Sequence, residues 1–229
     1  MKRWILTWLI ILLVVAIVNI GAKTTHTDVT KDIPDDFSMV ADYNLYNALY
    51  AVSLSDAELF LQSYDDMPVV VKATATGRMW QHYNVTLMEC TVQDVYKGDA
   101  SLVGKTVRYI FISYFDAEVK ALSFGTVNFM QQGDDYLVFM QEWERPVGWK
   151  EDGNLYYYID PTYGAAYRIP YFNFADVENV IPNSNEYDSI LGPTYGQMME
   201  NEVFVRDKQS LEMFLALKKR VFEVYVAAQ

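Results

Sequence analysis

The sequence has very few of the side chains that most often carry covalent or metal chemistry. It contains one cysteine, Cys90, and two histidines, His26 and His82, among 229 residues. A single cysteine excludes an intrachain disulfide, and these three side chains cannot supply the four ligands of a Cys/His zinc site. No G-x-S-x-G nucleophile elbow, phosphate-binding loop or dinucleotide fingerprint occurs. The sequence therefore nominates no catalytic, cofactor-binding or metal-binding residue, and we expect no cofactor.

Positive charge is also scarce. The chain has 18 Lys and Arg against 30 Asp and Glu, a formal net charge of −12. Lys2 and Arg3 precede a long apolar run, so the remainder carries 16 cations and 30 anions, a net of −14. Such a surface repels the phosphates of nucleic acid, and we expect no nucleic-acid partner. A high net negative charge also keeps a domain soluble.

Charge is absent altogether from Trp4 to Ala22, which are mostly Leu, Ile, Val and Trp. Nineteen helical residues span about 28 Å, close to the hydrocarbon thickness of a bilayer. Because Lys2 and Arg3 mark the cytoplasmic flank, we expect a single-pass anchor over residues 1–22 with the rest of the chain outside the cell membrane. The alternative is a cleaved signal peptide and a secreted domain. The long apolar core and Ile20, three positions before a cleavage after Ala22, favour the anchor.

The residues after the apolar run predict a tether and one extracytoplasmic domain. Residues 23–37 are polar and are typical of a tether, and residues 38–229 form the domain. Met39, Tyr43, Tyr46 and Tyr50 recur at helical spacing and predict a helix beginning at Ser38. A capping box at Ser55–Glu58 predicts a short helix over about Asp56–Ser63.

Strand patterns dominate the middle of the chain. Six segments predict strands, with turn residues between them: Val69–Thr76 (ended by Gly77), Tyr83–Tyr96, Lys105–Ser113, Tyr136–Met140, Leu155–Ile159 and Ala165–Ile169. In Lys105–Ser113 the residues Val107, Tyr109 and Phe111 share one face, whereas Tyr136–Met140 is apolar throughout and should be central. The spacing changes phase near Cys90–Asp94, which predicts a bulge there and a buried, inert Cys90.

The succession VVVKATATG, a long bent strand ending VYKGD, then KTVRYIF and GDDYLVFM resembles a known module. Over about Val69–Gln141 it resembles the OB-fold-like domains of uncharacterised bacterial membrane-anchored proteins, with the strand layout of the netrin/TIMP-type OB module. The resemblance implies a mainly β (α+β) domain built on a small OB-like barrel. TIMP-type inhibition needs an amino-terminal cysteine and disulfides, and this chain has neither. OB folds bind oligonucleotides or oligosaccharides, and the negative charge disfavours the former.

The carboxyl-terminal residues predict a second helix, Asp207–Ala227, packed on the barrel. Leu211, Phe214, Leu215, Phe222 and Tyr225 are expected on its buried face, and Lys218–Arg220 near its end, where cations suit the helix dipole.

Aromatic residues crowd the region before that helix. Five are candidate ligand contacts: Trp149, Tyr156, Tyr158, Tyr163 and Tyr167. One interpretation is cross-strand packing with alternate rings buried; the other is a platform that stacks on sugar rings or a peptide.

The absent motifs and the predicted anchor favour a non-enzymatic, membrane-tethered binding domain whose partner is a protein or a cell-envelope component. The alternative is a cell-envelope hydrolase with acidic catalytic residues. Two convergent carboxyl groups with shifted pKa values in a cleft would indicate the hydrolase.

Overall fold

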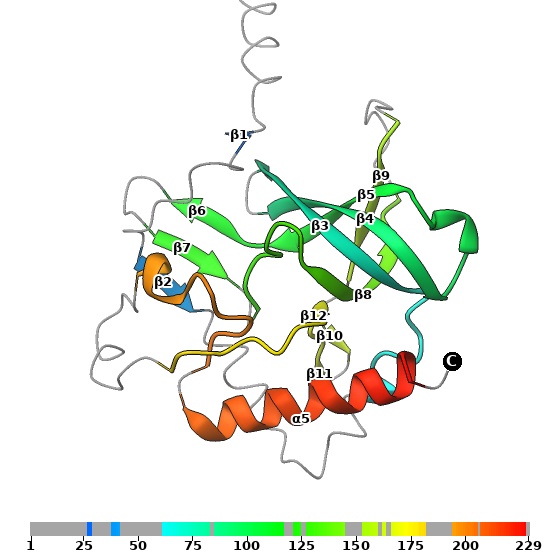
Figure 1. The fold of residues 1–229 in the computed structure, drawn as a ribbon. Helices are drawn as coiled ribbons and strands as arrows, with labels where there is room; N and C mark the ends of the chain where they lie inside the picture. Colours follow the sequence, from blue (N-terminus) through cyan, green and yellow to red (C-terminus); the bar gives the residue numbers. More distant parts are fainter. Residues whose placement is uncertain are drawn as a thin grey trace, which may run out of the picture.

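The computed structural model describes residues 27–28, 38–41, 61–82, 85–116, 121–124, 127–144, 153–159, 162–163, 166–181, 194–205 and 207–227. This part of the chain is mainly β with a carboxyl-terminal helix, as predicted (Figure 1). The predicted anchor at residues 1–22, nearly all of the tether at residues 23–37 and the capping box at Ser55–Glu58 lie outside it. Within the described residues, no helix is both long and apolar enough to cross a bilayer.

Five strands form a sheet that closes partly in a ring. They are β3 (Val69–His82), β4 (Val85–Lys97), β5 (Thr106–Ile112), β8 (Asp135–Glu142) and β9 (Leu155–Tyr158). The order is β3-β4-β5-β9-β8, and β8 pairs back onto β3. All of these pairings are antiparallel except β5 with β9. Two short strands extend the sheet: β12 (Tyr171–Asn173) on β8 and β1 (Thr27–Asp28) on β3.

Smaller elements lie around this sheet. Three strands form a second sheet: β2 (Ser38–Ala41), β7 (Ala121–Phe124) and β6 (Tyr114–Asp116). Two more strands, β10 (Thr162–Tyr163) and β11 (Ala166–Tyr167), pair with each other. The described chain also contains two short helices, η2 (Ala100–Leu102) and α4 (Tyr195–Met198). The helix predicted to begin at Ser38 is wrong at its start, because Ser38–Ala41 instead pairs in parallel with β7. Pairing with a neighbouring strand here outweighs the local helical spacing; the rest of that predicted helix lies outside the described residues.

Gly77 lies inside a strand, contrary to the prediction that it ends one. β3 continues from Val69 to His82, and its register against β4 shifts between Ala75 and Met79. Gly77 has φ +79°, and a Cβ placed on it would lie 2.8 Å from the Cβ of Gln132. Glycine is needed here because the backbone bulges in a left-handed conformation against another segment.

The bend predicted in β4 is confirmed. Asp94 and Val92 pair with the adjacent residues Lys72 and Ala73, so Gln93 between them is an extra residue. A bulge of this kind bends the strand and restores the inward direction of the apolar side chains on both sides of it. Cys90, just before the bulge, is fully buried, and burial raises the pKa of its thiol to about 12. The thiol is therefore protonated at neutral pH, as its predicted packing role requires.

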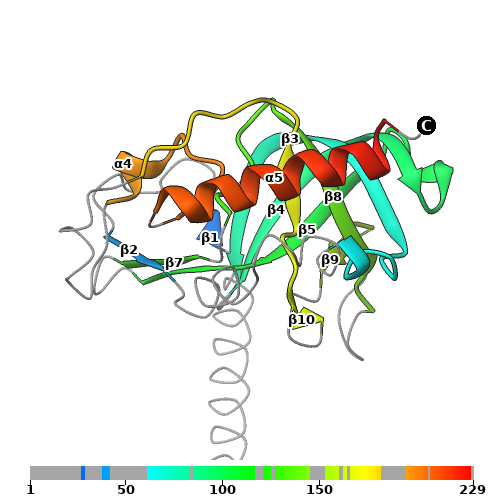
Figure 2. The same ribbon diagram turned by 90° about the horizontal axis from the view of Figure 1, so that it is seen from below.

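Helix α5 (Lys208–Tyr225) confirms the predicted carboxyl-terminal helix to within a residue or two at each end. Asp207 caps it, and its carboxylate accepts a hydrogen bond from the Ser210 amide at 2.7 Å. Figures 1 and 2 show α5 along one side of the main sheet, where Phe214 stacks on Phe172 of β12 with ring centroids 5.7 Å apart. The predicted buried face needs correction, because Leu215 is 43% exposed whereas Lys218 is buried.

Candidate functional site

An arginine–aromatic cluster lies on the outer side of the ring, away from its apolar interior. It consists of Arg78 and Trp80 of β3, Arg108 of β5, Trp143, and Tyr156 of β9. The Arg108 guanidinium carbon lies 4.5 Å from the ring centroid of Trp80 and 5.8 Å from that of Tyr156. Arg108 Nη1 donates a hydrogen bond to the Tyr156 hydroxyl at 3.0 Å. Two aromatic side chains therefore fix one planar cation.

The register of the strands explains why these residues meet. Arg108 is paired with Tyr156 across the parallel β5–β9 contact and with Glu89 across the antiparallel β4–β5 contact. Paired residues point to the same side of a sheet. Val107 and Tyr109, the neighbours of Arg108, are fully buried in the interior, so Arg108 points outward.

The Glu89 carboxylate lies beside the cluster. The Arg78 guanidinium carbon lies 5.0 Å from the Trp80 ring centroid, and Arg78 Nη1 lies 3.6 Å from Glu89 Oε1. The Thr76 hydroxyl also donates to Glu89 Oε1 at 3.1 Å, so the Glu89 carboxylate is well bonded. Arg78 thus contacts both the Trp80 ring and the Glu89 carboxylate.

An apolar strip continues the same side of β4 and β5. Leu87 of β4 is paired with Ile110 of β5, and Ile112 lies two residues further along the same face. Ile112 is 54% exposed, one of the most exposed large apolar side chains in the described chain. The face therefore offers a partner stacked cations at one end and the exposed Ile112 side chain at the other.

The predicted contact residues fall in three places. Tyr156 is buried in the arginine–aromatic cluster, with its ring 6.0 Å from that of Trp143, and Tyr158 is half-buried on the same strand. Tyr163 and Tyr167 belong to β10 and β11, and the structure describes only their backbone. Trp149 lies outside the described residues. The ligand-contact role of all five stays a prediction.

Trp80 and Arg108 were not predicted as contacts. The available signal was strand alternation, because an arginine between two inward apolar residues must point outward. Alternation says nothing about which rings on other strands would meet that arginine.

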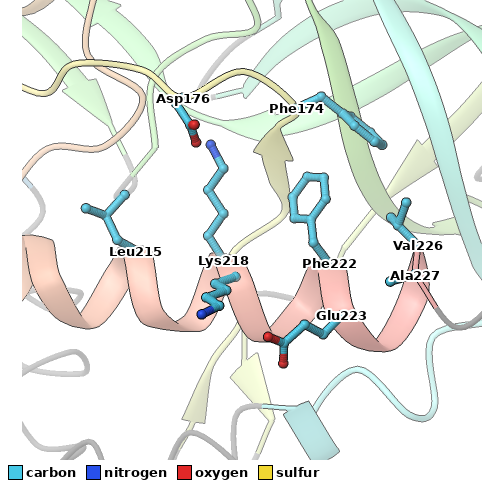
Figure 3. A pocket seen from close by; sticks show the side chains of 9 residues that line it. Phe174, Asp176, Leu215, Lys218, Phe222, Glu223, Val226 and Ala227 are labelled. Atoms are coloured by element: carbon cyan, nitrogen blue, oxygen red, sulfur yellow. The ribbon is translucent and has the colours of Figure 1, made fainter.

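A second candidate is an open groove along α5 with a volume of about 580 Å³. Figure 3 shows its walls: Phe174 lies on one side, and Leu215, Phe222 and Val226 of α5 lie on the other. The Phe174 and Phe222 rings meet edge to face, with centroids 4.8 Å apart. The remaining lining residues are Asp176, Lys218, Lys219, Glu223 and Ala227.

A buried ion pair lies beneath this groove. Lys218 Nζ is 2.7 Å from Glu202 Oε2 and donates a second hydrogen bond to the Ala175 carbonyl at 2.7 Å. The Asn173 amide donates to Glu202 Oε1 at 2.7 Å. Desolvation raises the pKa of Glu202, and Lys218 with the Asn173 amide opposes that shift. Lys218 and Glu202 thus have hydrogen-bond partners inside the protein. Because Glu202 also accepts from Asn173 of β12, the ion pair connects α5 to the sheet.

Comparison with known proteins adds no assignment: neither a protein-family model nor a curated protein matches the chain. In the described ranges no group of three or more His, Cys, Asp or Glu side chains is arranged to hold a metal ion.

Proposed function

We propose that this chain is a non-enzymatic, membrane-tethered extracytoplasmic domain, built on an OB-like barrel, that binds a protein or cell-envelope partner through the arginine–aromatic cluster. An OB fold is a five-stranded, partly open Greek-key barrel that binds ligands on the face of its second and third strands. The partly closed ring of this chain has five strands, and β4 and β5 are second and third in chain order. The uncharged run from Trp4 to Ala22 supplies the proposed membrane anchor.

The observation that carries this proposal is the stacking of Arg108 between Trp80 and Tyr156. Arginine and large aromatic residues dominate the energetics of binding surfaces. A guanidinium that contacts two rings and donates a hydrogen bond to one of them has already lost part of its rotamer freedom, so binding costs less entropy than at a free side chain. The exposed Ile112 extends this surface with area that a partner can cover.

The hydrolase alternative finds less support. It requires two carboxyl groups that converge on a cleft as acid and nucleophile or base. Glu202, whose pKa is raised, is buried against Lys218. Glu223 lines the groove but accepts from Arg220 Nη1 at 3.1 Å. Neither arrangement resembles an acid–base pair around a substrate.

Site-specific photocrosslinking in the native membrane tests the binding surface. The full chain carries a photoreactive amino acid either at Ile112 or, as a control of equal exposure, at Val180, which is 55% exposed on a different segment. We expect a discrete crosslinked product from position 112, absent from position 180 and lost when Trp80→Ala and Arg108→Ala are added. Equal products at both positions, or a product unaffected by these two substitutions, would contradict the proposal. Circular dichroism of each variant confirms that it is folded.

The anchor is tested separately by the mass of the mature protein in the membrane fraction. An intact amino terminus is expected, and loss of the first 22 residues would replace the anchor with a cleaved signal peptide.

A further inference from the structure

Helix α5 carries two apolar stripes, one fully buried and one partly exposed. Phe214, Leu217 and Val221 are buried against the sheet. Leu215, Phe222 and Val226 recur at intervals of seven and four residues, which places them together on an adjacent side of the helix. This second stripe faces the groove, with Phe174 as the opposite wall (Figure 3). The groove is therefore a partly open apolar surface at the edge of the core.

Its dimensions favour a small, elongated ligand over a protein. The volume of about 580 Å³ falls within the roughly 300–1,000 Å³ typical of small-molecule sites. The twelve residues from Leu215 to Val226 are separated by eleven helical rises, which extend about 16 Å along the helix axis. A stable protein interface uses about 20–30 residues on each side, far more than the nine that line this groove. An aliphatic chain matches an open groove with apolar walls of this length.

The charged residues at the rim of the groove indicate the charge of the ligand's polar head group. Lys218, Lys219 and Arg220 are three consecutive cations in a chain that is otherwise acidic. Lys218 is bonded to Glu202 and Arg220 to Glu223. Lys219 is exposed, lines the groove, and has no ion-pair partner among the residues that the structure describes. An anionic head at Lys219 would supply that partner while the chain lies against Phe222 and Leu215.

We propose that the groove along α5 binds the aliphatic chain of a single-chain anionic amphiphile, such as a fatty acid, with its head group at Lys219. This site is distinct from the arginine–aromatic cluster and does not depend on the proposed function. Burial of each methylene strengthens binding by up to about fourfold, so affinity should rise with chain length until the groove is full.

Photolabelling of the full chain in phosphatidylcholine nanodiscs tests the proposal. The probe is a fatty acid that carries a diazirine on its chain, and labelled residues are located by peptide mass spectrometry. We expect labelling of the peptide that contains Leu215–Val226, and competition by laurate stronger than by octanoate. Labelling spread evenly over the protein, or equal competition by the two acids, would overturn the site.

Matched variants separate the groove from general apolar contact. Val226→Trp fills the groove and should reduce labelling at least tenfold, whereas Val224→Trp, at a 40% exposed position outside the lining, should leave it unchanged. Leu215→Trp obstructs the groove from a more exposed position, so it remains informative if Val226→Trp unfolds the protein. Equal labelling of Val224→Trp and both groove variants would overturn the proposal.

The head-group assignment has its own variant. Lys219→Glu should reduce labelling by the fatty acid about three- to fivefold, the size of a surface charge interaction, and should not reduce labelling by the matching fatty alcohol. A fatty acid that labels Lys219→Glu as strongly as the wild type would overturn the role of Lys219.

Discussion

The outer surface of the partly closed ring has two different sides. On β8 and β12 the outward residues Phe139 and Phe172 are fully buried, and both pack against α5. On β5 the outward residues Arg108 and Ile110 are only partly buried. The same strand geometry thus gives a covered side and an open side. The difference lies in the outward side chains, since apolar ones require a covering helix and cationic ones can remain near water.

The two sides should therefore respond differently to substitution. The covered side is held by aromatic contacts and a buried ion pair, which contribute to the stability of the whole domain. The open side is held by stacked cations with one edge near solvent, and changes there should affect binding more than folding.

The largest effect is expected from Phe139→Ala on the covered side. The Phe139 ring contacts Tyr64 at a centroid distance of 4.3 Å and Tyr225 of α5 at 5.2 Å. Truncation should lower the free energy of unfolding by about 4 kcal/mol, because it removes apolar contacts and leaves a cavity. Urea denaturation measures this change. Ile112→Ala on the open side, the control, should change it by less than about 0.5 kcal/mol; similar losses for both would erase the distinction between the sides.

Lys218→Met should cost about 3 kcal/mol, because Glu202 is left as a buried carboxyl group without its cation. The loss should depend on pH. The folded-state pKa of Glu202 is already raised by desolvation, and without Lys218 it should rise further. A folded-state pKa above the unfolded value penalises folding as pH rises from the unfolded pKa through the folded pKa.

The destabilisation by Lys218→Met should therefore be larger at pH 8 than at pH 5, as measured by urea denaturation at the two values. Adding Glu202→Gln removes the titrating group and should abolish this difference. A loss independent of pH would show that Lys218 contributes packing rather than charge.

Arg108→Ala on the open side should cost about 1 kcal/mol of unfolding free energy, from loss of the cation–π contacts and of the hydrogen bond to Tyr156. Arg108→Lys keeps the charge but lacks the planar group, so it should recover little of that loss. Thermal unfolding with tryptophan fluorescence, which also reports on Trp80, measures both variants. Full recovery by lysine would mean that charge alone matters at this position.

The smallest effect is expected at Asp135. Lys72 Nζ at 2.8 Å and the Thr74 hydroxyl at 2.6 Å lower the pKa of the Asp135 carboxyl group. A lowered folded-state pKa stabilises the fold above the unfolded value of about 3.9 and loses that contribution as pH falls through the folded-state pKa. Asp135→Asn should cost about 0.5 kcal/mol at pH 7, because the pair is a third exposed, and nearly nothing at pH 2. An equal cost at both pH values would point to the hydrogen bond from Thr74 instead of the charge.

Local pattern predicted much of the fold. Alternation placed Val107, Tyr109 and Phe111 on one face, which is buried, and the mostly apolar run marked β8 as a central strand. A phase change predicted a bulge or bend near Cys90–Asp94, where the structure has the extra residue Gln93. These features depend on neighbours in the sequence, so they can be inferred without knowing the rest of the structure.

Features that depend on distant residues could not be predicted. Helical spacing identifies apolar stripes on α5 but not which of two adjacent stripes meets the sheet, so Leu215 was expected inside and is exposed. The sequence suggested only a helix-dipole role for Lys218. Its ion-pair partner Glu202 lies on a separate segment, so local pattern could not identify the pair. The arginine–aromatic cluster likewise forms only when β3, β5 and β9 come together.

The strand β3 also bears on how fast the domain folds. Its pairing with β4 joins segments that are adjacent in the chain, whereas the contact that closes the ring joins Val71 to Val138. Closing a long loop costs more entropy than forming a hairpin, and chains rich in such distant contacts fold slowly. The β3–β4 hairpin is thus suited to form early, and β8 must join it for the ring to close. Until then the edge of β3 that β8 covers is available to other chains, so ring closure sets how long the newly made protein is exposed to aggregation.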